Sequence, residues 1–449
     1  MISLVQKSED VRLFGTASIM LSVRVVGTLL TLTYTLLMVA VAPPDEVGRA
    51  FAALSTGFLL SVVASLNVEA GSIRFLPLYL ETDRPEDAAG FVFWCRRTVL
   101  VICATVMVPV SAIMIWIYGL DAMGPFVLSF AAAPIMANAR INSRQGVALG
   151  LVLRASLPRI LVRPLVMVAF LGTATVMGWT LTATHIMAAL CVAAALETGL
   201  QWAFIRHALA FRRAVPARFD QARAWVPFGL MLSPTLVMHE YLRDVIIMTA
   251  GFVLLPGDVA KLGISLSMIG ILNFALNAFD MAFSPKISRA IVQGNSKGCA
   301  RLLTLCGIGK LGVLMLGVPL AWVFIPLALD VMGADYAGIE TMFLVLVLIP
   351  ASRAVFGPAN LVLNVTGHKQ VLFWCALAGA GAILLGVFVG EALAETAGVI
   401  IGAAVAVASY QTLLFAMCRW HTGVDTTALS LMWERRKLEG AFHGPDPAA

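Results

Sequence analysis

Long blocks of apolar residues alternate with polar loops along the whole chain. A helix needs roughly 20 apolar residues to cross the hydrocarbon core of a bilayer, which is about 30 Å thick. The blocks reach this length repeatedly and predict about twelve membrane-spanning helices. The predicted spans are 15–42, 49–68, 98–118, 123–140, 160–179, 182–205, 226–254, 262–284, 302–327, 338–361, 371–390 and 397–418. The pattern therefore predicts an all-α integral membrane protein.

Composition agrees with this pattern, since 60% of the 449 residues are hydrophobic and 12% are charged. Soluble domains are about 45–50% apolar and about 25% charged. Most of the surface is therefore expected to face lipid. The first block, 15–42, is too long for the core of a signal peptide and no small-residue cleavage site follows it, so we predict that it is a retained span.

The formal net charge of +6 is unevenly distributed. One set of loops is longer and basic, whereas the alternate loops are short and acidic. The acidic residues of the second set are Asp45, Glu46, Asp121, Asp258, Asp330, Asp335, Glu391 and Glu395. Basic loops stay on the cytoplasmic side, so both termini are predicted to be cytoplasmic. The charge thus indicates a partnership with the phospholipid bilayer and no nucleic-acid partner.

A basic segment in the middle of the chain separates two sets of six spans. The predicted divisions are a six-helix bundle at 1–205, a basic cytoplasmic linker at 206–225, a second six-helix bundle at 226–418, and a cytoplasmic tail with an amphipathic segment at 419–449. Similar sequences, 44–49 and 256–261, open the second and eighth spans and indicate duplication. Six spans is an even number, so the bundles are expected to be related by a pseudo-two-fold axis along the membrane normal.

No sequence motif points to catalysis. The chain lacks a phosphate-cradling loop and a dinucleotide-binding glycine motif. Its seven cysteines are scattered and form no Cys-x-x-Cys or Cys/His ligand set. We therefore expect no cofactor, no metal site and no enzymatic activity, which favours transport.

Basic residues inside the apolar blocks are the main candidates for function. A charged group at the centre of a spanning helix costs at least about 2.5–3.5 kcal/mol, so it should face protein or a water-filled cavity. Arg24 lies nine residues into its span, about 13 Å at 1.5 Å per residue. Arginine binds phosphate bidentately. The residues predicted to line a cationic cavity for a diphosphate group are Arg24, Arg243, Lys310 and Arg353.

Structural alternatives remain open for these cations. Glu240, Arg243 and Asp244 lie close enough on one helix to neutralise one another. No acid lies within four residues of Arg24, Lys310 or Arg353, so their partners would have to come from other spans. Structural roles are also predicted for residues near span ends. Glu69 is predicted to pair with Arg74, and Arg163 is predicted to be an interfacial anchor.

Acidic residues in or near the spans are candidates for ion coupling, because protonation of such a carboxylate alters helix packing. These candidates are Glu69, Glu197, Glu240, Asp244 and Asp280. Asn273, Asn277 and Asp280 follow helical spacing, so one face of the eighth span is predicted to be polar and to line the cavity.

Three stretches carry a resemblance to a known family: Arg24–Gly27 with Asp45–Phe51, Glu69–Pro77, and Gly357–Lys369. The chain resembles the polysaccharide or O-antigen flippases of the multidrug/oligosaccharidyl-lipid/polysaccharide exporter superfamily. The resemblance implies alternating-access movement of a polyprenyl-diphosphate-linked oligosaccharide, for example in lipopolysaccharide biosynthesis, between the leaflets of a bacterial inner membrane. It also implies coupling to a proton or another cation, and a glycan polymerase and export proteins as partners.

Three other classes of membrane protein fit the sequence less well. The multidrug exporters of the same superfamily have twelve spans but favour acidic lumens. Major-facilitator carriers have a characteristic glycine- and arginine-containing loop after the second span, and 80–87 does not match it. A membrane-embedded glycan polymerase or ligase commonly has a large outer loop, whereas every predicted outer loop here is short.

Overall fold

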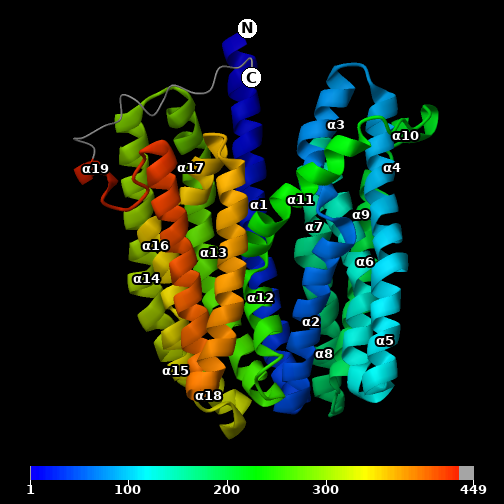
Figure 1. Cartoon of the computed structure of the whole chain (residues 1–449), viewed down its shortest axis with the longest axis vertical. Coiled ribbons are helices and arrows are strands. Elements are labelled where there is room, and N and C mark those ends of the chain that lie inside the picture. The colour runs from blue at the N-terminus through cyan, green and yellow to red at the C-terminus, as the bar shows by residue number, and fades with distance from the viewer. Residues whose placement is uncertain (1, 434–449) are drawn as a thin grey trace. The chain divides into compact units, whose positions relative to one another are not determined.

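The computed structural model describes residues 2–433, and this part of the chain contains helices and no β-strand. Within it, nine helices are long and apolar enough to cross a membrane, and one of them, Lys369–Thr422, covers two predicted spans. The two predicted spans outside this set are 123–140, which lies in one helix, and 226–254, which is a broken helix. The chain divides into two compact units, Met1–Ser233 (unit 1) and Pro234–Ala449 (unit 2) (Figure 1).

Unit 1 contains the first six predicted spans. Its elements are α1 (Ile2–Val41), α2 (Pro44–Ser65), η1 (Val68–Gly71), α3 (Ser72–Glu81), α4 (Pro85–Ile102), η2 (Cys103–Met107), α5 (Val108–Tyr118), α6 (Leu120–Ala148), α7 (Val152–Leu157), η3 (Pro158–Val162), α8 (Arg163–Met177), α9 (Ala183–Ile205), α10 (Phe211–Ala214) and the start of α11 (Ala222–Glu240). Each of the six predicted spans coincides with one helix or with one run of consecutive helices.

The third span begins earlier than predicted, since α4, η2 and α5 form one run from Pro85 to Tyr118. Proline at the first position of a helix has no amide hydrogen to leave unpaired. Acidic residues follow in the first turn, where the helix dipole favours them, and Asp87 pairs with Arg84 at 2.6 Å. The helix therefore extends beyond the apolar segment from which the span was predicted.

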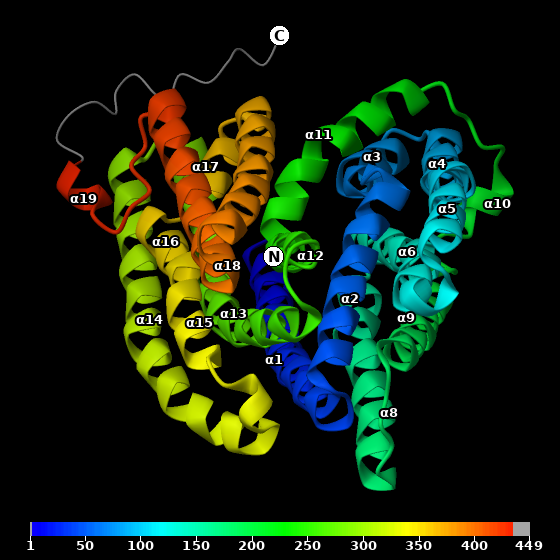
Figure 2. The ribbon, with the colours of Figure 1, turned by 60° about the horizontal axis from the view of Figure 1, so that its bottom comes forward.

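Helix α6 packs against α2 and α9 and forms the centre of unit 1. Helix α2 ends at two residues with positive φ, Leu66 (φ 48°) and Asn67 (φ 53°). Such angles are uncommon for residues with a side chain and interrupt the helix. The chain then continues through η1 into α3, which packs beside α4 (Figure 2).

The core of unit 1 has an aromatic cluster beneath α3, α4 and the start of α11. Trp225 is fully buried, and its ring meets Phe91 edge-on at 5.3 Å. The Trp225 Nε1–H donates to Tyr79 Oη at 2.9 Å, which satisfies the polar end of the buried indole.

Residues 206–225, predicted as a linker, lie within unit 1, and the boundary between the units falls inside α11 at Ser233 and Pro234. The Arg218 amide donates to the Glu86 carbonyl at 3.1 Å. At Gly90 an added Cβ would lie 1.8 Å from the Arg218 carbonyl oxygen, so the segment packs directly on α4.

Unit 2 contains the last five predicted spans and most of the seventh, 226–254, whose first residues belong to unit 1. Its elements are the end of α11, α12 (Leu242–Ala250), α13 (Pro256–Val292), α14 (Ser296–Met332), η4 (Ala334–Tyr336), α15 (Ile339–Leu346), α16 (Leu348–Phe356), α17 (Ala359–Val365), α18 (Lys369–Thr422) and α19 (Ser430–Trp433). Helix α13 packs against α14 and α15, and α18 packs against α16 and α17.

The last two predicted spans are the two arms of α18, separated by non-helical residues Ala394 and Glu395. The arms touch through glycines: an added Cβ on Gly398 would lie 1.9 Å from the Gly390 carbonyl oxygen. Glycines allow this close helix approach, as their clustering in the sequence indicates. In Figure 1 the two arms form the orange and red hairpin.

The predicted amphipathic tail falls partly outside the described residues, which end at 433. The described part includes α19, which packs against α14, and the Leu431 amide donates to Thr304 Oγ1 at 3.2 Å. The basic residues 435–437 of this prediction lie outside the described residues.

Candidate functional site

Helix α13 presents three polar side chains on one face: Asn273, Asn277 and Asp280. Arg353 from α16 donates to two of them, through Nη1 to Asn273 Oδ1 at 3.1 Å and through Nη2 to Asn277 Oδ1 at 2.8 Å. The same Nη2 lies 3.9 Å from Asp280 Oδ2. The spacings of four and three residues place all three acceptors on one stripe. The predicted polar face of the eighth span therefore holds a guanidinium.

Lys310 from α14 approaches the same carboxylate. Its Nζ lies 2.5 Å from Asp280 Oδ1, and its side chain is 2% exposed. Asp280 is thus the acid for two basic groups, Lys310 and Arg353. We call Asn273, Asn277, Asp280, Lys310 and Arg353 the α13 cluster. Counted as ionised groups, the cluster has two positive charges and one negative charge.

The end of α16 is fixed by a segment that follows α18. Gly357 ends this helix with φ 67°, and an added Cβ there would lie 1.9 Å from the Thr426 carbonyl oxygen. The Thr426 Oγ1 hydroxyl donates to the Phe356 carbonyl at 2.6 Å. Arg353 lies in the last turn of the helix, where the dipole favours a cation. These contacts hold the guanidinium at its position on α13.

Arg243 also contacts α13, one end of which lies beside α12. Its Nη2 donates to Ser267 Oγ at 2.9 Å and to the Gly263 carbonyl at 3.4 Å. His239, near the end of α11, is within electrostatic range of Asp280, Lys310 and Arg353. Glu240 ends α11 and Asp244 lies in the first turn of α12. Three of the four predicted cations are therefore held against α13 in unit 2.

Arg24, the fourth predicted cation, belongs to α1 in unit 1 and is exposed. Its backbone carbonyl accepts a hydrogen bond from Thr28 Oγ1 at 2.9 Å. The α13 cluster comprises residues of unit 2, so the four-residue cavity across both halves stays a prediction.

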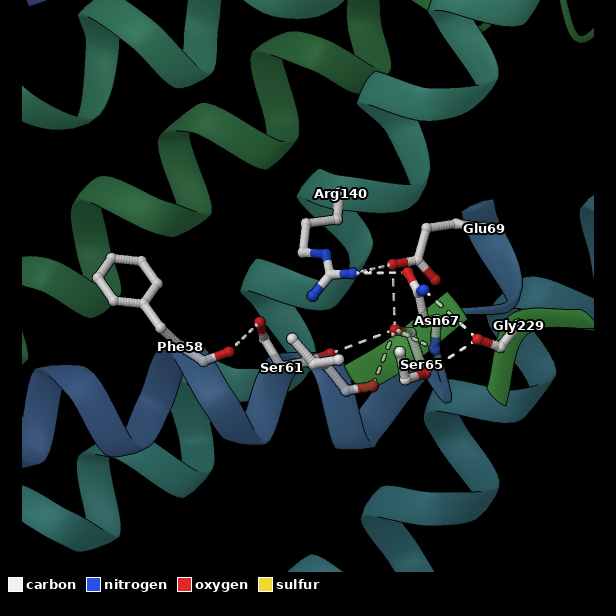
Figure 3. A network of polar contacts seen from close by, with 9 residues as sticks. Phe58, Ser61, Ser65, Asn67, Glu69, Arg140 and Gly229 are labelled. Atoms are coloured by element: carbon white, nitrogen blue, oxygen red, sulfur yellow. Dashed lines mark hydrogen bonds and ion pairs between the residues drawn. The ribbon is translucent and has the colours of Figure 1, made fainter. Parts of the chain in front are cut away.

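Glu69 pairs with Arg140 and not with the expected Arg74. The Arg140 Nη2 donates to Glu69 Oε1 at 2.5 Å and to Asn67 Oδ1 at 3.1 Å. The Ser65 hydroxyl donates to the same carboxylate oxygen at 3.2 Å (Figure 3). The interruption of the helix after α2 places Glu69 against α6, whereas Arg74 lies over the ring of Phe75.

Figure 3 shows that this network links three elements of unit 1, since the Asn67 side-chain amide donates to the Gly229 carbonyl of α11 at 3.4 Å. Glu69 is 1% exposed and Arg140 is 7% exposed. A buried ion pair of this kind is strongly destabilised when one partner is removed.

Glu197 pairs with Arg163, the residue predicted to be an interfacial anchor. The Arg163 Nε–H donates to Glu197 Oε2 at 2.7 Å, and the Glu197 side chain is fully buried. Arg163 is 15% exposed and its guanidinium also lies 5.3 Å from the centre of the Phe58 ring. Glu69 and Glu197 are therefore buried acids that each pair with an arginine, and a role for either in ion coupling stays a prediction.

Sequence reasoning missed two arginines of unit 1 that the structure places in polar contacts, Arg140 and Arg96. Arg96 donates to Asn142 Oδ1 at 2.8 Å and to Asn138 Oδ1 at 3.4 Å. Asn138 and Asn142 are four residues apart, as Asn273 and Asn277 are. This spacing could have indicated the contact from the sequence.

Comparison with solved structures gives whole-chain similarity to transporters. The inward-facing conformation of a multidrug resistance MATE family transporter of the MOP superfamily has a TM-score of 0.66 at 14% identity, covering 89% of this chain and 97% of the other. The outward-facing conformation of a multidrug resistance MATE family transporter of the MOP superfamily has a TM-score of 0.54 at 12% identity, covering 90% and 94%. No protein-family model matches the chain, and no curated protein matches it.

At such identities the similarity concerns the fold. The predicted fold class, an all-α membrane protein with twelve spans in two bundles, is confirmed, and the protein crosses the membrane many times. The chain therefore has the fold of the MATE family transporters of the MOP superfamily.

Proposed function

We propose that the protein is an alternating-access transporter that exports an anionic amphiphile, with Lys310 and Arg353 as its basic binding residues. The observation that carries this proposal is the α13 cluster, in which two cations share the single carboxylate of Asp280. A net positive site within a membrane bundle attracts a negatively charged group. The fold supports transport, since similar structures are named as inward-facing and outward-facing transporter conformations.

The amphiphile that we propose is a polyprenyl-diphosphate-linked oligosaccharide, moved from the inner to the outer leaflet of a bacterial inner membrane. This choice rests on the resemblance to polysaccharide flippases and on the suitability of arginine for phosphate oxygens. Surface polysaccharide synthesis would then supply the partners, a glycan polymerase and export proteins. The charge asymmetry of the loops supports cytoplasmic termini.

Asp280 is the residue through which we propose coupling to a cation. Its Oδ1 contacts Lys310 and its Oδ2 faces Arg353, so protonation would weaken both interactions together. An anionic substrate would compete with Asp280 for the same two cations. Substrate binding and protonation of Asp280 would therefore favour each other, and each would raise the affinity for the other by the same factor.

Multidrug export is the second candidate, and a specific observation favours it: both similar structures are named as multidrug resistance transporters. The two candidates differ in the charge of the cargo. A cationic drug would be repelled by Lys310 and Arg353 and would need a different site.

The test is transport by the full-length protein reconstituted in proteoliposomes. One arm follows a fluorescent polyprenyl-diphosphate oligosaccharide moving between leaflets, and the other follows efflux of a lipophilic cationic dye. We expect movement of the diphosphate lipid, its loss in Arg353→Gln, and normal activity in the control Arg289→Gln, which changes an exposed arginine near the end of α13. Dye efflux that survives Arg353→Gln, without movement of the lipid, would establish the multidrug candidate instead.

A further inference from the structure

Two arginines of unit 1 lie against one tryptophan. The Cζ atoms of Arg96 and Arg212 are each 4.6 Å from the centroid of the Trp202 ring. The three side chains come from α4, α10 and α9. Each guanidinium is attracted by the indole. The two positive charges are at most twice this distance apart, so they repel each other and would be stabilised together by an anion.

Arg96 has neutral hydrogen-bond partners and, among the residues that the structure describes, no ion-pair partner. Its two terminal nitrogens donate to Asn138 and Asn142, and its Nε is buried and makes no hydrogen bond. No carboxylate of the described chain forms an ion pair with Arg96, and the guanidinium of Arg212 contacts the same tryptophan ring. A partly buried guanidinium with neutral partners is stabilised by an oxyanion, which accepts from several donors at once.

The position of these residues matches the headgroup level of a membrane. Arg96 lies two residues before the predicted apolar span 98–118, and Trp202 lies in the last turn of α9. Helix α4 begins and α9 ends at this side, which the charge asymmetry assigns to the cytoplasm. Tryptophan and arginine are both favoured at this depth.

An apolar surface continues from Arg96 along α4. Phe93, three residues earlier, is 53% exposed, and Leu100, four residues later, is 71% exposed. These spacings place both side chains on the same face of the helix as Arg96. A phospholipid whose acyl chain lies on this apolar face would bring its phosphate group to the guanidinium. A free phosphate ion has no acyl chain and would make no contact with this face.

We propose that Arg96, Arg212 and Trp202 form a binding site for the phosphate group of an anionic phospholipid. The site belongs to unit 1 and is separate from the α13 cluster of unit 2. It does not depend on the identity of the transported substrate. An occupied site would hold α10 against α4 and α9, since the lipid phosphate would bridge arginines from α4 and α10.

The test uses the full-length protein in a neutral detergent. Native mass spectrometry measures retained lipid, and thermal unfolding measures stabilisation, after addition of phosphatidylglycerol, phosphatidylcholine or inorganic phosphate. We expect retention and stabilisation with phosphatidylglycerol alone. Arg96→Gln and Arg212→Gln should each weaken this binding about tenfold, the size expected for loss of a charge-assisted hydrogen bond.

The matched control is Arg154→Gln, which changes an exposed arginine on α7 of the same unit. It should bind phosphatidylglycerol as the unchanged protein does. Equal loss in the control, equal binding of phosphatidylcholine, or equal stabilisation by inorganic phosphate would each overturn the proposal. Should Arg96→Gln fail to fold, Arg212→Gln decides the question, because α10 lies outside the predicted spans.

Discussion

The Nζ atom of Lys310 lies 2.5 Å from Asp280 Oδ1, in an ion pair whose lysine is 2% exposed. Helices α13 and α14 pack together and bring the two residues into contact. Removing one partner of a buried ion pair leaves the other charge uncompensated. The resulting loss in the free energy of unfolding is larger than the net stabilisation that the intact pair provides. The pair is therefore sensitive to single substitutions.

The first prediction concerns Asp280→Asn. We expect this change to lower the free energy of unfolding by about 3–5 kcal/mol, because Lys310 loses its counter-charge in a buried position. Thermal unfolding of the purified protein in detergent measures the effect. Asp330→Asn, at an exposed position on α14, is the control and should unfold at the original temperature. Adding Lys310→Met to the Asp280→Asn variant should restore much of the stability.

The Lys310→Met rescue shows whether the stability is lost through the uncompensated charge or through changed packing. If Asp280→Asn, Lys310→Met unfolds at the same low temperature as Asp280→Asn alone, the uncompensated charge is not the cause of the loss.

The second prediction concerns Arg353→Lys. Lysine keeps the positive charge but has no planar fork to reach Asn273 and Asn277 together. We expect transport of the diphosphate lipid to fall about tenfold, in line with loss of a charge-assisted hydrogen bond, while membrane insertion is retained. The proteoliposome assay measures transport, and protein recovered from the membrane measures insertion. Unchanged transport in Arg353→Lys would mean that charge alone is required there.

The polar stripe of α13 could be predicted from the sequence, because Asn273, Asn277 and Asp280 are related by helical periodicity within one element. The partners of this stripe could not be predicted. Lys310 and Arg353 reach it from α14 and α16, and their approach depends on how three helices pack. Helical spacing shows which face is polar but does not indicate which other helix covers it.

The pairing of Glu69 shows the same limit. Arg74 is close to Glu69 in the sequence, and sequence proximity favoured that pair. The positive φ angles of Leu66 and Asn67 instead turn the chain so that Glu69 meets Arg140 on α6. The spans themselves were predicted well, because each depends on local apolar length.

The third prediction concerns Glu69→Gln. We expect a loss of stability of about 3–5 kcal/mol, since Arg140 is 7% exposed and its guanidinium would stay buried without this carboxylate. Ser65→Ala, which removes a single hydroxyl bonded to the same carboxylate, should cost about 1 kcal/mol. Thermal unfolding ranks the two variants. Glu81→Gln at an exposed position of α3 serves as the control, and a loss there of similar size would contradict the explanation.

The fourth prediction concerns the glycine contact between the two arms of α18. In Gly398→Ala the new Cβ would meet the Gly390 carbonyl oxygen at 1.9 Å, so the arms must move apart. Overpacking of this kind costs about 1–3 kcal/mol, and we expect a lower unfolding temperature. Gly381→Ala, in the same helix, meets no atom within 4 Å. Alanine favours the helix by up to about 1 kcal/mol over glycine, so this control should unfold at the same or a higher temperature. Equal destabilisation by both changes would show that α18 depends on glycine for a reason other than the contact between its arms.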